Sequence, residues 1–204
     1  MGSPDLPQGA HDAQQAYEVT AVKGMAVRPE AFRDFFGAVP TAVAVVTTTG
    51  SDGRPTGFTC NAFSAVSLDP ALLLVCVDER SRTLPALLDS KVFALHLLAD
   101  NGGESLARVF AGRSDQKFAG ASWQGGNSIP DCPVLLDGVL AYTECALEQS
   151  VPAGDHRLLI GRMERVWTRP RGGTGEDAHP LLYQQGQFVA WDIEAATSAM
   201  AARA

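Results

Sequence analysis

Short segments rich in valine, leucine and threonine recur along the chain, and turn signals separate them. TAVAVVTTTG at residues 41–50 precedes the hairpin signal Asp52-Gly53, and we expect residues 57–68 to form the return strand of that hairpin. PALLLVCV at residues 70–77 begins at the turn Asp69-Pro70 and is typical of a buried third strand. Residues 91–99 are typical of a further strand, residues 134–169 of three more, and residues 181–192 of a terminal strand pair or an irregular edge. No Gly-x-Gly-x-x-Gly motif opens a helix after a strand, which argues against a Rossmann domain. The pattern therefore predicts a mainly β fold with a few helices, an antiparallel barrel.

Three segments have helical character. PEAFRDFFGAV at residues 29–39 places a proline in the first turn and spaces Phe32, Phe35 and Phe36 at i, i+3 and i+4. SRTLPALLDS at residues 81–90 predicts a short helix capped by Ser81 or Thr83. NGGESLARVFAG at residues 101–112 predicts the third helix, and a long loop over residues 113–133 follows it.

The length of 204 residues suits a single domain with its own core. We expect residues 1–25 to form a disordered tail, residues 26–194 the domain, and residues 195–204 a C-terminal tail. The net charge of −7 argues against a nucleic-acid surface, and no apolar run is long enough to predict a membrane span. Four scattered cysteines without a Cys-x-x-Cys pair indicate reduced thiols and a cytoplasmic location. The four histidines lack metal-ligand spacing, so we expect no metal site.

Polar and small side chains are concentrated in GFTCNAFS, residues 57–64. Thr59, Asn61 and Ser64 have groups that can hydrogen-bond the polar edge of a flat ligand, and Ala62 would let such a ligand approach the backbone. A partly exposed strand with its polar face in water explains the same residues, and it is the favoured interpretation of this stretch taken alone.

Four other segments can be interpreted either as parts of a site or as plain structure. Residues 40–47 begin a strand whose first backbone groups could bond a ligand, or they simply separate helix from strand. His156 beside Asp155 is either a nicotinamide contact or proton relay, or a turn histidine. Arg82 between Ser81 and Thr83 would hold a phosphate at a helix start, or lie in solvent. Lys117 and Phe118 would supply an anion contact and an aromatic lid, or belong to a solvated loop with one anchoring ring.

Taken together and in order, these segments resemble the flavin reductase family, which has a flavin-binding split barrel. The resemblance covers about residues 30–192 and rests on FRDFFGAVPTAVAVVTT, GFTCNAFSAVSLDPALLLVCV, SRT, FALHLL, LARVFAGRSDQKF, GDH and PLLYQQGQF. Each motif is weak alone, whereas the ordered set is specific. Ala42 stands where the family more often has glycine, and Asp69-Pro70-Ala71 replaces a more usual Asp-Pro-Pro.

The resemblance implies an antiparallel Greek-key split barrel that binds FMN or FAD and uses NADH or NADPH as hydride donor. It assigns contacts with the flavin ring to the first strand, and contacts with the ring and the ribityl chain to the polar stretch at residues 57–64. The phosphate end of the flavin would lie at the SRT segment, residues 81–83. The implied cofactor-binding residues are Thr41, Ala42, Val43, Thr59, Cys60, Asn61, Ala62, Ser64, Ser81, Arg82, Thr83, Phe118 and His156. His156 would meet the nicotinamide and Asp155 would orient its ring, so these two are the candidate catalytic residues.

The activity implied by the resemblance is that of an NAD(P)H:flavin oxidoreductase, a homodimer that supplies reduced flavin to a partner oxygenase. Direct hydride transfer needs no protein nucleophile and no metal, because the cofactors carry the reactivity. One alternative keeps the fold but makes the chain a flavin carrier or storage module. Another is an oxidase of the pyridoxamine-phosphate type, for which we would expect more basic phosphate ligands. The GDH motif at residues 154–156 favours the reductase.

Overall fold

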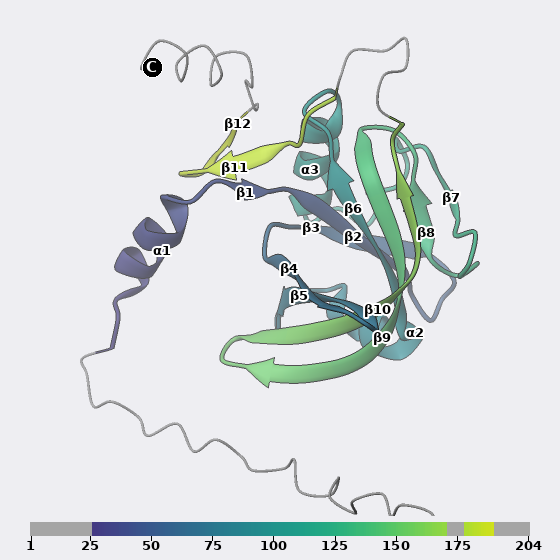
Figure 1. Ribbon diagram of the computed structural model, residues 1–204, viewed down its shortest axis with the longest axis horizontal. Coiled ribbons are helices and arrows are strands. Elements are labelled where there is room, and N and C mark those ends of the chain that lie inside the picture. Colours follow the sequence, from purple (N-terminus) through teal and green to yellow (C-terminus); the bar gives the residue numbers. More distant parts are fainter. Residues whose placement is uncertain (1–25, 171–177, 190–204) are drawn as a thin grey trace, which may run out of the picture.

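The computed structural model describes residues 26–170 and 178–189 (Figure 1). The predicted terminal tails at 1–25 and 195–204 lie outside the described residues. The helices are α1 (Pro29–Gly37), α2 (Leu84–Ser90) and α3 (Gly103–Ala111). The strands are β1 (Thr41–Ala42), β2 (Ala44–Thr49), β3 (Pro55–Cys60), β4 (Phe63–Leu68), β5 (Ala71–Asp78), β6 (Val92–Leu98), β7 (Trp123–Gly125), β8 (Pro133–Leu135), β9 (Val139–Ala153), β10 (His156–Thr168), β11 (Leu182–Gln184) and β12 (Gln187–Val189).

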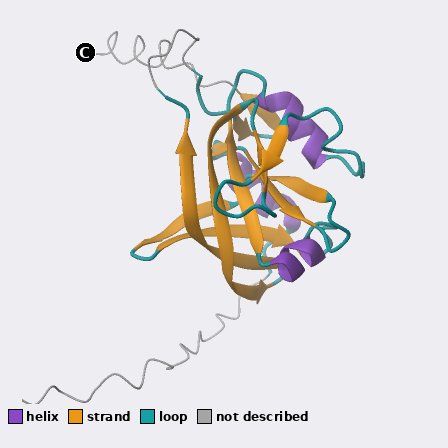
Figure 2. Ribbon diagram, turned by 90° about the vertical axis from the view of Figure 1, so that its right-hand side faces the viewer, coloured by secondary structure: helices purple, strands orange, loops and turns teal. Residues whose placement is uncertain are grey.

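One large antiparallel sheet forms the body of the molecule (Figures 1 and 2). Its strand order is β3-β2-β6-β9-β10-β5-β4, so β3 and β4, which are consecutive in the chain, lie at opposite ends of the sheet. The described residues contain no hydrogen-bonded ladder between those two end strands, and the barrel therefore stays split. Two small sheets, β1-β11-β12 and β7-β8, pack beside it. The predicted antiparallel split barrel is confirmed.

The sequence pattern located most elements, with three differences. The strand expected over residues 41–50 is interrupted at Val43, so that β1 pairs with β11 while β2 joins the large sheet, and the loop expected over residues 113–133 contains the short strand β7. The third difference lies in the polar stretch. The expected helices and the three strands within residues 134–169 are present as predicted. The stretch 57–68, expected as a single return strand, forms the two strands β3 and β4, and β4 pairs with β5 instead of continuing the β2–β3 hairpin. Thr83 stands at the start of α2 as predicted, but its hydroxyl does not cap the helix; the Ser81 hydroxyl accepts the Thr83 N–H at 3.3 Å.

Strand β2 is buried on both faces and divides the core into two clusters. Ala44 and Val46 face the barrel interior together with Leu87 of α2. Val45 faces the other way and packs in the cluster that contains Phe110 of α3 and Leu135 of β8. The alternation follows from the period of two along a strand, and burial of both faces explains why this segment is so rich in valine.

His96 is a fully buried polar residue in the middle of β6. The Leu135 N–H donates to its Nε2 at 3.0 Å, so Nδ1 carries the proton and donates to the Val45 carbonyl oxygen at 3.0 Å. Its ring lies 5.9 Å from that of Tyr142, which in turn stacks on Trp167. Burial lowers the pKa of His96 to about 4, because a charged imidazole would be cut off from water. Through these two hydrogen bonds the neutral ring connects β8 to β2 and β6 at the centre of the sheet.

Acidification from pH 6.5 to about 4 should destabilise the fold through His96. The pKa of this residue falls from 6.5 to about 4 on folding, so the unfolded chain takes up the proton first. The stabilising contribution is complete above pH 6.5 and is lost as the pH falls through 4; we expect a loss of about 1–3 kcal/mol. Urea titrations at pH 7, 5.5 and 4.5 measure it. The His96→Gln variant should be less stable at pH 7, and its free energy of unfolding should depend less on pH over this range. An equally steep fall of the free energy of unfolding in both proteins would contradict the assignment.

Glu144 is a fully buried carboxylate side chain on β9. Its carboxylate accepts the backbone N–H groups of Asn127, Ser128 and Ile129 at 2.9, 2.8 and 2.7 Å. The guanidinium of Arg165 comes within 3.9 Å at the edge of this contact. A carboxylate on β9 thereby holds one end of the long loop that connects α3 to β8.

Helix α1 and strand β4 are among the places where apolar side chains are exposed. Helix α1 stands away from the barrel in Figure 1 and buries none of its residues. Phe32, Phe35 and Phe36 keep 57%, 70% and 56% of their surface exposed. Strand β4, at one end of the sheet, exposes Val66 and Leu68. Within the described residues, no helix is long and apolar enough to cross a membrane.

Candidate functional site

A cleft of about 850 Å³ lies between β3, the end of α3 and the β11–β12 hairpin; we call it the hairpin cleft. Four of the predicted cofactor-binding residues line it, namely Val43, Thr59, Cys60 and Asn61. Its other walls include Arg108, Tyr183, Gln187 and Phe188. Its size and its mixture of aromatic, aliphatic and polar walls are typical of small-molecule sites.

Hydrogen bonds fix the polar side chains on the barrel side of the hairpin cleft. The Thr59 hydroxyl donates to the Ala107 carbonyl oxygen of α3 at 2.6 Å. The Asn61 amide donates to the Thr41 hydroxyl at 3.1 Å, and that hydroxyl donates to the Tyr183 carbonyl oxygen at 3.3 Å. Two segments that are far apart in the sequence, the end of β3 and the β11–β12 hairpin, are therefore joined through Thr41.

The remaining predicted contacts of the first strand and of the polar stretch have other surroundings. Ala42 pairs with Leu182 in the small sheet and is half-buried. Ala62 is exposed between β3 and β4, and Ser64 is exposed on β4. The Ser64 hydroxyl donates to the carbonyl oxygen of the next residue. Cys60 is buried, and desolvation raises the pKa of its thiol to about 12, which keeps it protonated.

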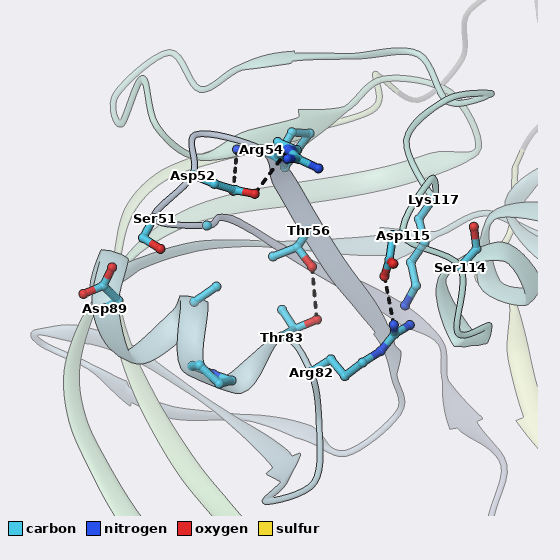
Figure 3. Close-up of a pocket in the computed structure, with 14 residues that line it drawn as sticks. Ser51, Asp52, Arg54, Thr56, Arg82, Thr83, Asp89, Ser114, Asp115 and Lys117 are labelled. Atoms are coloured by element: carbon cyan, nitrogen blue, oxygen red, sulfur yellow. Dashed lines mark hydrogen bonds and ion pairs between the residues drawn. The ribbon is translucent and has the colours of Figure 1, made fainter.

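A second cleft, of about 670 Å³, is formed by the β2–β3 turn, the start of α2 and the loop before Phe118 (Figure 3). Arg82 and Thr83 line it, and the Ser81 hydroxyl accepts a hydrogen bond from the Thr83 N–H. The Arg82 guanidinium points across the cleft to Asp115 at 2.8 Å and also donates to the Arg113 carbonyl oxygen. The predicted phosphate-binding segment therefore faces a cavity of its own.

Lys117 lies at the edge of the second cleft and is tied to the backbone. Its ammonium donates to the carbonyl oxygens of Gly57 at 2.9 Å and Phe110 at 2.7 Å. Partial burial, with the charge of Arg82 nearby, lowers the pKa of Lys117. The side chain thus binds the outer edge of β3 to the end of α3.

Phe118 does not line either cleft. It is 9% exposed and packs edge-to-face against Phe110, with ring centroids 5.0 Å apart, and against Trp123 at 5.5 Å. The structure therefore places this predicted flavin contact in the core, where it anchors the loop, as the alternative interpretation of Phe118 expected.

His156 and Asp155 lie at the turn of the β9–β10 hairpin, where Gly154 has a positive φ of 66°. The His156 Nδ1 and the Asp155 carboxylate are 2.7 Å apart, and this hydrogen bond lowers the pKa of Asp155. The Asp155 carbonyl oxygen accepts the Glu79 N–H at 3.0 Å. The hairpin turn therefore adjoins the segment that leads into Ser81.

A charged pair, Asp78 and Arg80, lies next to this turn. Asp78 lies opposite His156 in the β5–β10 ladder. The Asp78 carboxylate binds Arg80 at 2.9 Å, and these hydrogen bonds lower the pKa of Asp78 to about 2. The GDH and SRT motifs, more than seventy residues apart in sequence, are therefore neighbours in the fold.

Comparison with known proteins matches residues 36–192 to the family model described as "Flavin reductase like domain". The chain belongs to this family. A flavin reductase (NADH) of Kitasatospora aureofaciens is 40% identical over 165 residues, which cover 81% of this chain and 83% of that protein. The reductase subunit of a flavin-dependent monooxygenase of Rhodococcus jostii is 35% identical, covering 83% and 81%. Some other relatives are longer, and the chain spans less than half of them.

Among solved structures, an NADH:FAD oxidoreductase of Streptomyces globisporus in complex with NAD and FAD fragments superimposes with a TM-score of 0.72. It is 30% identical and covers 84% of this chain and 99% of that one. The predicted family, fold and enzyme class are thereby confirmed. The roles of individual residues stay predictions.

Sequence reasoning for this flavin reductase family member missed part of the hairpin cleft. Arg108 lies with its guanidinium carbon 5.0 Å from the ring centroid of Phe188, and Tyr183 packs edge-to-face on the same ring. The motif PLLYQQGQF marked the closing segment, but its aromatic residues gave no sign that they face β3. A search for aromatic residues in terminal hairpins would have raised Tyr183 and Phe188 as candidates.

Proposed function

We propose that the protein reduces FMN or FAD by hydride transfer from NADH or NADPH and delivers the reduced flavin to a partner oxygenase. The observation that carries this proposal is the convergence of Val43, Thr59, Cys60 and Asn61, all predicted flavin contacts, on one cleft with aromatic walls. The kinship with a flavin reductase (NADH) and with a monooxygenase reductase subunit supports the reaction and the partner.

The residues of the hairpin cleft fit a flat ring with a polar edge. Phe188 offers apolar surface, and Asn61 is exposed with its amide already oriented by Thr41. Arg82 and Thr83, in the second cleft, would receive the phosphate end. When bound, the flavin supplies the hydride acceptor, and the protein's contribution is to hold and align the reactants.

A flavin fluorescence titration together with an NAD(P)H oxidation assay tests the function. We expect saturable quenching with FMN or FAD and flavin-dependent oxidation of NADH or NADPH. Unchanged fluorescence up to high micromolar protein would refute flavin binding. Binding without oxidation of either nicotinamide would favour the carrier module instead.

His156→Ala should lower kcat/KM for NAD(P)H while leaving flavin affinity nearly unchanged. His156 is half-exposed beside Asp155 at a hairpin turn rather than in the core, and we propose that it bonds the nicotinamide dinucleotide. Loss of such a hydrogen bond costs about 0.5–3 kcal/mol, which corresponds to a drop of roughly twofold to a hundredfold. Steady-state kinetics and flavin titration on one preparation measure both quantities.

Asp155→Asn should show a milder form of the His156→Ala defect, because it removes the charge that orients the ring but keeps an oxygen acceptor. A purely structural His156 would give a different result: lower melting temperature and equal losses in flavin and nicotinamide binding. Wild-type kinetics in His156→Ala would remove this residue from the site.

We further propose that the protein is a cytoplasmic homodimer. The exposed phenylalanines of α1 support the dimer, because a helix with no buried residue and three outward aromatic rings gains stability only from a partner surface. The four cysteines are free thiols, which supports a reducing compartment.

A further inference from the structure

Arg108 is the one cation among the described residues that line the hairpin cleft. It lies in the last turn of α3, and Glu104, one turn earlier, accepts its Nε at 2.9 Å and its Nη2 at 2.6 Å. Its guanidinium also lies over the ring of Phe188, with the carbon 5.0 Å from the centroid. Contacts to two different elements therefore hold the charge at the cleft wall without burying it, since 65% of the side chain is exposed.

The hydrogen bonds of Arg108 leave part of its donor set for a ligand. Both bonds to Glu104 end on the same oxygen, Oε1, and use Nε and Nη2. Within the part of the chain that the structure describes, Nη1 has no hydrogen-bond partner. Glu104 balances the charge, so a neutral ring can enter the cleft without meeting an uncompensated cation. A ring that gains a negative charge would compete with Glu104 for the guanidinium.

We infer that Arg108 stabilises the negative charge that a flavin ring acquires on reduction; this rests on the proposed function. In that reaction the nicotinamide C4–H bond breaks and an N5–H bond forms on the flavin, which gains two electrons. Without uptake of a further proton, the ring carries one negative charge along its N1–C2=O edge. A guanidinium with free N–H donors suits such an edge, because charge-assisted hydrogen bonds to a planar anion are strong.

The same arginine chemistry would also suit a phosphate, but the geometry favours the ring. The residues proposed for the phosphate end, Arg82 and Thr83, line the second cleft. The residues proposed for the ring, Val43, Thr59 and Asn61, share the hairpin cleft with Arg108. Arg108 would therefore share its cleft with the ring, which is the part of the flavin whose charge changes during the reaction.

The test measures the affinity of the full chain for oxidised and reduced flavin under anaerobic conditions, at a pH where the reduced ring is anionic. Riboflavin and FMN are used in parallel, because riboflavin lacks the phosphate. Arg108→Gln should weaken binding of both reduced flavins about tenfold more than binding of the oxidised forms. Glu104→Gln removes the competing carboxylate and should shift the reduced-to-oxidised affinity ratio several-fold in the opposite direction.

A matched control comes from Arg162 and Glu148, an exposed pair with a 2.8 Å contact on the β9–β10 hairpin that lies outside both clefts. Arg162→Gln and Glu148→Gln should leave the affinity ratio unchanged. Circular dichroism and melting temperature check that each variant is folded. Arg108→Lys keeps the charge without the planar fork and should retain part of the preference for reduced flavin.

Three outcomes would overturn the assignment. If Arg108→Gln weakens FMN in both redox states but leaves riboflavin unaffected, the residue binds the phosphate. If neither Arg108→Gln nor Glu104→Gln changes the ratio, the ion pair only supports α3. If the wild-type chain binds neither flavin, the proposed function fails together with the inference, which separates that failure from the other two.

Discussion

Replacing Glu144 with alanine should lower the free energy of unfolding by about 3–5 kcal/mol. The carboxylate is fully buried on β9 and accepts three backbone N–H groups, those of residues 127, 128 and 129. Alanine would leave these donors without an acceptor and open space beneath the loop. Urea denaturation measures the effect as a shift in the midpoint concentration of urea. An unchanged dependence of the free energy of unfolding on urea concentration would show that the unfolded state is not altered.

Two variants control for this result. Glu144→Gln keeps one acceptor oxygen but turns an NH₂ group toward backbone donors, so it should lose an intermediate amount of stability. Glu148→Ala, on the exposed part of the same strand, breaks only a surface ion pair with Arg162 and should cost less than about 1 kcal/mol. A Glu144→Ala variant within about 1 kcal/mol of wild type would mean that water replaces the carboxylate.

Changing Phe32, Phe35 and Phe36 together to serine should convert the proposed dimer into a monomer of 21.5 kDa. Each ring is more than half exposed on α1, so an interface that covers them would lose three aromatic anchors. At about 2 kcal/mol for an anchor of this kind, allowing for non-additivity, the dissociation constant should rise at least about a thousandfold. Analytical ultracentrifugation over a dilution series measures it.

The melting temperature of the α1 monomer should stay close to that of a diluted wild-type sample, because these rings pack against one another rather than against the barrel. Val166→Ser, an exposed apolar position on β10, serves as the control and should leave the mass unchanged. A wild-type mass of one subunit at all concentrations would refute the dimer. A triple variant that stays dimeric would move the interface elsewhere.

The strands and α1 were predictable because their signals are local: β-branched runs, turn residues, and phenylalanines at helical spacing. The barrel-side wall of the hairpin cleft was also predictable, since Thr59, Cys60 and Asn61 are adjacent in sequence. Arg108 and Phe188 were not, because eighty residues separate them and only the folded small sheet brings the ring beneath the guanidinium. Phe118 was placed in the site because its motif suits a lid and a core anchor equally well.

His96 and Glu144 show a second limit. Both are polar residues in the middle of apolar strands, where the sequence pattern does not indicate what a polar side chain would bond. Their partners are backbone groups of residues 45, 127–129 and 135. Every residue offers a backbone carbonyl oxygen, and every residue except proline a backbone N–H, so the partner positions have no side-chain signature that a reader of the sequence could recognise.

The two ends of the large sheet differ in their resistance to aggregation. An end strand exposes unpaired backbone groups that can recruit a strand from another molecule. On β3 the carbonyl oxygen of Gly57 accepts a hydrogen bond from the Lys117 ammonium, so part of this edge is covered. On β4 the described residues provide no comparable cover, and Val66 and Leu68 add exposed apolar surface. Self-association of unfolding or over-concentrated protein would therefore begin at β4, and a charged residue at position 68 is the change best suited to suppress it.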